Sequence, residues 1–399
     1  MTGAWLAGED PGARKFIKVG DIELESGEII PDVTIAYQSY GELNQSADNA
    51  ILVNHAWTGW SDVEGWWPNM VGPGKPLDTN KYFVVCPNVI GGCQGSTGPA
   101  SIATDGKFYG SRFPSLTIRD MVAAEVAFTD AMGINKYVLA CGPSLGGMRS
   151  LEWAVQFPDR VGGICTIGSS AVATGDQIGS VSTQVHAIKA DRYFNGGDYY
   201  DQEHGPIEGM GIARKIAHLT YRTEYEMDTR FGRDLQGDET GRYAVQSYLD
   251  HQANKLARRF DANTYIALES AMISHDIGRD RGGVEAALAT AKVPVVVVSI
   301  DTDRLFPPRL QAGLDLALYL LFFIPGVVAL AYAGYNYAAD SWATNSCAST
   351  VAAPRWGVRT IFGQSKNGCP PTRGSSTNTS NAAPARCPDL SAAATASSL

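Results

Sequence analysis

Short apolar runs alternate with amphipathic stretches along the first 170 residues, and one further run follows near residue 293. Residues 119–132, RDMVAAEVAFTDAM, and the run GGMRSLEWAVQF after Ser144 repeat their apolar positions with the period of a helix. Apolar runs of strand length lie at 50–55, 82–89, 137–141, 161–167 and 293–300. This alternation predicts an α/β fold with a mostly parallel sheet covered by helices. The last run, VPVVVVSI, is almost wholly β-branched, which favours a strand buried on both faces.

The segment 171–290 differs from the sheet-forming parts on either side of it. It is rich in charged and aromatic residues and contains no clear buried strand. We interpret it as a mainly helical cap inserted into the sheet domain, whose core then comprises residues 1–170 and 291–340.

The C-terminal part of the chain changes in composition after residue 310. Residues 316–339 carry no charge, and an uncharged run of this length raises the possibility of a membrane span. Pro325 and Gly326 interrupt the run, so a buried helix and strand or a misfolded segment is the favoured interpretation. In residues 341–399, 33 of 59 are Ala, Ser, Thr or Pro, which predicts a low-complexity, disordered tail.

Charge and cysteine content exclude several classes of protein. The 399 residues are 44% hydrophobic and have a net charge of −9, so nucleic acid is not the expected partner. The seven cysteines are scattered without CxxC spacing, which argues against a metal site and against a disulfide framework. The N-terminus does not have the pattern of a secretory signal. These features favour a cytoplasmic protein.

The strongest chemical signal is the sequence Gly142-Pro143-Ser144-Leu145-Gly146, between a predicted strand and a predicted helix. A serine at such a turn is typical of a nucleophile elbow, which presents the hydroxyl group above the sheet. The alternative is a glycine-rich turn in which the serine only caps the helix.

A nucleophilic serine needs a base and an orienting acid, which follow it in the order acid and then histidine in elbow-type enzymes. Asp301 and Asp303 follow the last predicted strand, although carboxylates there are also common turn residues. The six histidines all precede them, so that order cannot be completed within this chain. His275, from the predicted cap, is the first candidate for a base that replaces the missing histidine. Its alternative role is that of a surface or hydrogen-bonding residue.

Two loops after strands point to a binding pocket. The segment NHAWTG at 54–59 follows the first predicted strand, where the amide of Trp57 and the amide of Leu145 would together form an oxyanion hole. The glycine-rich GGCQGSTGP at 91–99 follows the next strand, where ligands of parallel sheets bind.

Taken together, these segments resemble the homoserine O-acetyltransferase family, acyltransferases of methionine biosynthesis with the α/β-hydrolase fold. The resemblance extends from about residue 17 to residue 308, and its details are similar to the actinobacterial branch. The segments that carry it are NHAWTG, PNVIGGCQGSTGP, RFPSLTIRDMV, CGPSLGGMRSLEWA, ARKIAHLTYRTEYEMDTRFGRD, SYLDHQANKLARRFDANTY, SHDIGRDRGG and DTDRLFPP.

The resemblance implies a role for several residues. Ser144 would accept an acetyl group from the co-substrate acetyl-CoA, with Asp303 as the triad acid. Arg214 would hold the amino-acid substrate, because a guanidinium can grip the carboxylate of L-homoserine with two hydrogen bonds. The family also implies a homodimer. We expect no metal site, and no cofactor beyond the co-substrate.

The chain departs from the family pattern at three places. The Gly-His-Asp segment that supplies the family's histidine has no counterpart after residue 308. Pro143 replaces the usual glycine before the nucleophile, and Trp57 stands where leucine is usual. A shifted reading frame near codons 310–330 is one explanation of the altered end, and a diverged tail is the other. The sequence therefore leaves three alternatives to homoserine acetylation: a related acyl transfer (serine acetylation or O-succinylation), ester hydrolysis, or ligand binding without turnover.

Overall fold

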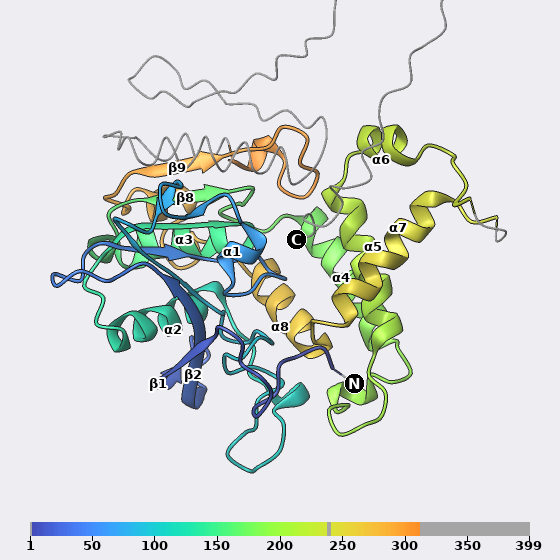
Figure 1. The fold of residues 1–399 in the computed structure, drawn as a ribbon, viewed down its shortest axis with the longest axis horizontal. Helices are drawn as coiled ribbons and strands as arrows, with labels where there is room; N and C mark the ends of the chain where they lie inside the picture. The colour runs from blue at the N-terminus through green and yellow to red at the C-terminus, as the bar shows by residue number, and fades with distance from the viewer. Residues whose placement is uncertain (1, 238–240, 312–399) are drawn as a thin grey trace, which may run out of the picture.

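The computed structural model describes residues 2–237 and 241–311, which are built around a seven-stranded sheet (Figure 1). The strand order is β1-β2-β6-β3-β7-β8-β9; β1, β2 and β6 pair antiparallel, and the remaining neighbours pair parallel. The strands are β1 Lys15–Glu23, β2 Ile29–Tyr40, β3 Ala50–Val53, β6 Phe83–Pro87, β7 Tyr137–Pro143, β8 Ile164–Ile167 and β9 Val295–Val298. A separate pair joins β4 Val71–Gly72 to β5 Leu77–Asp78. The five predicted strand runs are confirmed as β3, β6, β7, β8 and β9.

The prediction that the run at 293–300 is buried on both faces is wrong. Only Val295 of β9 is buried, and Val296, Val297 and Val298 are partly exposed. Within the described residues β9 is the last strand of the sheet and pairs only with β8. A strand with one neighbour keeps part of its surface open, whatever its side chains favour.

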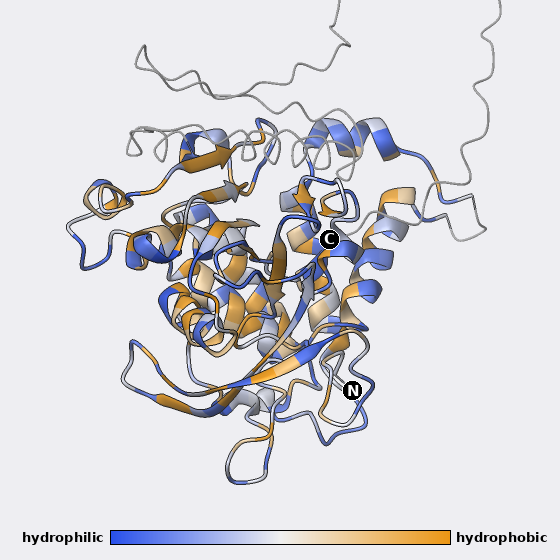
Figure 2. Ribbon diagram, turned by 60° about the vertical axis from the view of Figure 1, so that its left-hand side comes forward, coloured by the Kyte–Doolittle hydropathy of each residue, from blue (hydrophilic) through white to orange (hydrophobic). Residues whose placement is uncertain are grey.

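Helices cover both faces of the sheet. The predicted helices at 119–132 and after Ser144 are confirmed as α2 Ile118–Ala131 and α3 Leu145–Gln156. They pack with the larger hydrophobic core, which contains Leu52, Phe128 and Trp153. The other face is covered by α1 Val63–Trp66 and the β4–β5 segment, around Ile51 and Leu139. In Figure 2 the hydrophobic residues gather on the sheet and on the helix faces that meet it.

The described residues between 175 and 288 form helices and no strand of the sheet. These helices are α4 Gly175–Lys189, α5 Ile207–Tyr221, α6 Glu224–Phe231, α7 Ala244–Ala257, α8 Ala262–Ile273 and α9 Val284–Leu288. Helices α4, α5 and α7 lie side by side, and α8 lies between them and the sheet (Figure 1). Ile188, Met210 and Leu268 belong to the same hydrophobic cluster as Leu145, so these helices share the core of the sheet.

No helix in the described ranges is long and apolar enough to cross a membrane. The uncharged run at 316–339 and the predicted tail at 341–399 lie outside the described residues. The hypothesis of a shifted reading frame concerns that same part of the chain.

Candidate active site

Ser144 occupies the sharp turn between β7 and α3, with backbone angles φ +53° and ψ −120°. A non-glycine residue at positive φ costs on the order of 1–3 kcal/mol and persists only where its surroundings hold it. Here the Ser144 amide donates to Ile167 O at 2.9 Å, and Ser169 Oγ donates to Ser144 O at 2.8 Å. The alternative that Ser144 only caps the helix is wrong, because its side chain makes no capping hydrogen bond.

The flanking glycines allow two backbone segments to approach closely. A Cβ atom added at Gly142 would lie 2.2 Å from Asn54 O, and one at Gly146 would lie 2.0 Å from the same oxygen. Pro143 is the last residue of β7 and lies opposite Ile167 of β8. The turn that carries Ser144 therefore rests directly on the segment that leads to Trp57.

The segment before Trp57 is fixed by a buried network. His55 Nε2 accepts from the Val89 amide at 3.1 Å, and Arg149 Nη2 donates to His55 O at 2.7 Å. Burial and the neighbouring Arg149 lower the pKa of His55 to about 3, so this imidazole stays neutral. With both ring nitrogens engaged, His55 positions the loop and does not serve as a base.

Leu145 and Trp57 lie on the two segments that meet at this turn. Leu145 is the first residue of α3, and amides in the first turn of a helix have no intrahelical carbonyl partner. Trp57 lines a pocket beside the turn, and its buried indole Nε1 makes no hydrogen bond with the described residues. The oxyanion hole formed by these two amides stays a prediction.

Asp303 is buried in the loop after β9. Its Oδ1 accepts from the amides of Leu305 at 2.8 Å and Phe306 at 2.9 Å. Its Oδ2 faces Gly168, the residue that follows β8. Burial raises the pKa of Asp303 to about 6, although the two amides act in the opposite direction. Asp301, the other candidate, is less buried, and burial also raises its pKa.

None of the six histidines, all of which lie within the described residues, hydrogen-bonds Ser144 or Asp303. His186, His204 and His251 are exposed. His275 is buried with Nε2 unpartnered, and its ring contacts the backbone of Ser170. Burial lowers the pKa of His275 to about 4. The structure therefore does not bring His275, the candidate base, into contact with the nucleophile.

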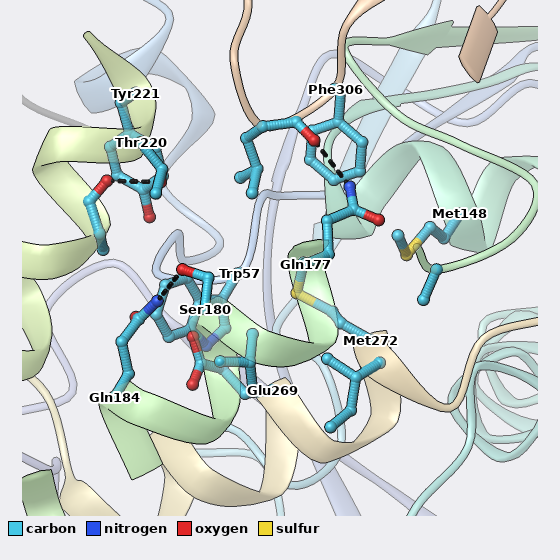
Figure 3. A pocket seen from close by; sticks show the side chains of 15 residues that line it. Trp57, Met148, Gln177, Ser180, Gln184, Thr220, Tyr221, Glu269, Met272 and Phe306 are labelled. Carbon is cyan, nitrogen blue, oxygen red and sulfur yellow. Dashed lines mark hydrogen bonds between the residues drawn. The ribbon is translucent and has the colours of Figure 1, made fainter. Parts of the chain in front are cut away.

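A pocket of about 430 Å³, part of it open to solvent, is lined by Met148 of α3, the helix that begins directly after Ser144 (Figure 3). Its walls come from α3, α4, α5 and α8, together with the loops that carry Trp57 and Phe306. Trp57 packs edge-to-face on Tyr265, with ring centroids 4.4 Å apart. Thr220 and Tyr221 form one side of the pocket, and Glu269 lies on the side of the pocket that Trp57 lines (Figure 3).

Arg214 lies on α5, seven residues before Tyr221, on the same side of the helix. Its side chain is buried, and the guanidinium carbon lies 5.6 Å from the Tyr221 ring centroid. Its Nε and Nη1 have no hydrogen-bond partner among the described residues. A buried guanidinium with two unpartnered donors is suited to an anionic ligand such as a carboxylate.

Glu269 is the site residue that the sequence interpretation missed. It is buried on α8, lines the pocket and has no described partner for Oε2. A signal for it exists in the sequence. Tyr265, Leu268, Glu269 and Met272 have the spacing of one helix face, so the acid interrupts an apolar stripe.

Comparisons with known proteins agree with this geometry. A family model described as the alpha/beta hydrolase fold matches residues 49–320. The homoserine O-acetyltransferase of Nocardia farcinica is 52% identical over 327 residues, which cover 78% of this chain and 86% of the relative. The solved homoserine O-acetyltransferase of Bacillus anthracis superposes with a TM-score of 0.70 at 26% identity, covering 76% of this chain and 87% of the other. An acetylester hydrolase of Corynebacterium glutamicum superposes with a TM-score of 0.67 at 29% identity, covering 81% and 90%.

Proposed function

This chain belongs to the homoserine O-acetyltransferase family of the α/β-hydrolase fold, and we propose that it transfers the acetyl group of acetyl-CoA to the hydroxyl group of L-homoserine. One observation carries the proposal. In a chain half identical to such enzymes, Ser144 has the positive φ of a nucleophile elbow at the start of α3, and α3 and α5, the helix that carries the buried Arg214, both line one pocket.

The reaction would proceed in two half-reactions. Ser144 Oγ attacks the thioester carbonyl, the C–S bond breaks, and coenzyme A leaves as the thiol while acetyl-Ser144 forms. The hydroxyl of homoserine then attacks that ester, and Ser144 Oγ leaves and recovers a proton. The amides of Trp57 and Leu145 would stabilise the oxyanion of each tetrahedral intermediate.

Arg214 would position the acceptor for the second half-reaction. Its guanidinium, in which Nε and Nη1 are unpartnered, offers free donors to the homoserine carboxylate. Holding that end of the molecule aims the side-chain hydroxyl at the acyl-enzyme, which replaces a bimolecular encounter by an oriented one.

This chain differs from its family in the catalytic base, which in the family is a histidine. Asp303 would orient a histidine, but no histidine contacts it or Ser144. Because general-base catalysis contributes about 10²–10⁴-fold, we propose that turnover by this chain is slower than that of its relatives by a factor of that order.

Thiol release from acetyl-CoA tests the proposed function. The purified 399-residue chain is assayed with and without L-homoserine, beside Ser144→Ala and His275→Ala variants. We expect slow, homoserine-dependent release that Ser144→Ala abolishes and His275→Ala leaves unchanged, because His275 does not contact the nucleophile. Equal release by Ser144→Ala and the unsubstituted chain would refute the proposal.

Ester hydrolysis is a second candidate, favoured by the likeness to the acetylester hydrolase of C. glutamicum. In that reaction water in place of homoserine discharges acetyl-Ser144. The two functions differ in their product, so acetate formed at the same rate with and without homoserine would favour the hydrolase.

The proposal also covers the compartment, the oligomeric state and the cap of the enzyme. We propose a cytoplasmic homodimer in which residues 171–290 form the cap, as the family resemblance implies. Cys86, Cys93, Cys141 and Cys165 are buried free thiols, which supports a reducing compartment. Sedimentation of the purified chain measures its oligomeric state.

A further inference from the structure

A carboxyl group without a partner lies in the wall of the pocket. Glu269 is 2% exposed, and its Oε2 makes no hydrogen bond with any described residue. Burial raises the pKa of Glu269 well above its usual value. The mechanism proposed above does not use this residue.

Leaving such a group unpaired costs free energy in the empty protein. A buried polar group without a hydrogen bond destabilises a fold by about 1–3 kcal/mol, and by more when it carries a charge. An uncharged side chain at this point in the apolar stripe of α8 would avoid that cost. Unpaired buried acids are concentrated at binding sites, where a ligand supplies the missing partner.

Arg214, whose charge is opposite to that of a carboxylate, lies near the same pocket. The guanidinium carbon of Arg214 lies 5.6 Å from the Tyr221 ring centroid, and Tyr221 and Glu269 line the same pocket. No ion pair joins Arg214 to Glu269 within the described residues. The site therefore holds a cation and an acid that remain separate near Tyr221, with Nε and Nη1 of Arg214 and Oε2 of Glu269 unpartnered.

We propose that Glu269 binds the α-ammonium group of the amino-acid acceptor while Arg214 holds its carboxylate. The proposal rests on the proposed function for its ligand and adds the residue that distinguishes an amino acid from a simple hydroxy acid. An ammonium group supplies hydrogen-bond donors and the compensating charge that Oε2 lacks. Trp57 and Met272 line the same pocket and are buried, and a charge pair is stronger in such low-dielectric surroundings than in water.

The consequence is selectivity for one functional group. L-Homoserine and 4-hydroxybutyrate share the carboxylate, the hydroxyl and the carbon chain, and differ in the amino group. A charge-assisted hydrogen bond lost at a buried site weakens binding by about 10- to 100-fold. Glu269 is expected to supply that preference for homoserine.

Calorimetric titration of the full chain with each of these two compounds, without acetyl-CoA, tests the inference. In the unsubstituted chain homoserine is expected to bind about 10- to 100-fold more tightly than 4-hydroxybutyrate. In Glu269→Gln this preference disappears, because homoserine binding weakens while 4-hydroxybutyrate binding is unchanged. Glu208→Gln, on the exposed first turn of α5, is the matched control and keeps the preference.

Thermal unfolding of the same variants separates binding from folding. Glu269→Gln and Glu269→Leu remove an unpaired buried acid, so each is expected to melt at or above the temperature of the unsubstituted chain. If a variant loses the preference for homoserine but keeps its stability, Glu269 acts in binding and not in folding. Glu269→Leu is expected to lose the preference as well.

Retention of the full preference by Glu269→Gln would overturn the inference, and so would equal binding of the two compounds or no binding by the unsubstituted chain. These results are independent of catalysis. If homoserine binds in a Glu269-dependent manner but no acetyl transfer occurs, the proposed function fails and the inference stands.

Discussion

At the scale of single residues, the position of Ser144 is determined by its neighbours. Gly142 and Gly146 permit the contact with Asn54, and hydrogen bonds from the Ser144 amide and to its carbonyl hold the positive φ. The GxSxG spacing, together with its position between a predicted strand and a predicted helix, predicted this turn from the sequence. It could not predict the neighbours that close the site, because these come from loops distant in the chain.

Asp303 gives a pH-dependent prediction at the same scale. Its pKa is 3.8 in an ordinary setting and about 6 in the fold, so the folded chain retains the proton to higher pH than the unfolded chain. Stability relative to Asp303→Asn is therefore greatest below pH 3.8 and falls as the pH rises to about 6. The expected total fall is about 3 kcal/mol in denaturant unfolding experiments between pH 3.5 and pH 7.

The control for this prediction is Asp176→Asn, which removes an exposed carboxyl from the first turn of α4. It reports the general effect of removing a negative charge. A stability difference between the unsubstituted chain and Asp303→Asn that does not vary across this pH range would contradict the prediction. Such a result would mean that a cation compensates the Asp303 carboxylate.

Glu269 shows the limit of sequence reasoning about individual residues. The residue interrupts an apolar helix face, a pattern visible in the printed sequence. Its significance depends on the pocket and on Arg214, which lies 55 positions earlier on another helix. Only the fold brings the two into one site.

At the scale of elements, α2 and α3 are joined by a buried charged network that also holds the loop of the site. Glu125 accepts from Arg149 Nη1 and, at 2.7 Å, from Trp153 Nε1, while Arg149 Nη2 donates to His55 O. Arg149 is 0% exposed. The network links both helices to the segment that precedes Trp57.

Glu125→Gln is therefore expected to lower the free energy of unfolding by about 3–5 kcal/mol. The substitution leaves the buried Arg149 charge uncompensated, and a glutamine offers only one acceptor to two donors. Denaturant unfolding measures the change. Asp32→Asn, which breaks the exposed Lys18–Asp32 pair, is the control and is expected to cost at most about 1 kcal/mol.

Apolar runs predicted strands correctly where all residues of a strand are buried. The four residues of β3 and the five of β6 are all buried, and their apolar runs predicted both strands. The hairpin of β1 and β2 was not predicted, because its strands mix exposed and buried positions and bulges shift the register near Gly20. The burial of β9 was overestimated because its composition does not indicate how many neighbours it has.

At the scale of the whole molecule, the site combines segments from across the described chain. Trp57, Ser144, Arg214, Glu269 and Asp303 come from five different parts of the sequence, and helices α4, α5, α7 and α8 share one core with the sheet. The predicted fold and family are confirmed. The order of serine and acid along the chain also follows the predicted pattern, and the printed sequence has no histidine after His275.

The central claim is that Ser144 is the nucleophile that accepts the acetyl group. Intact-mass and peptide-mass measurements of the 399-residue chain after incubation with acetyl-CoA test it most directly. We expect one acetyl group on the peptide that contains Ser144, its absence in Ser144→Ala, and its removal when L-homoserine is added. A folded chain that remains unacetylated, or an acetyl group that persists in Ser144→Ala, would contradict the account.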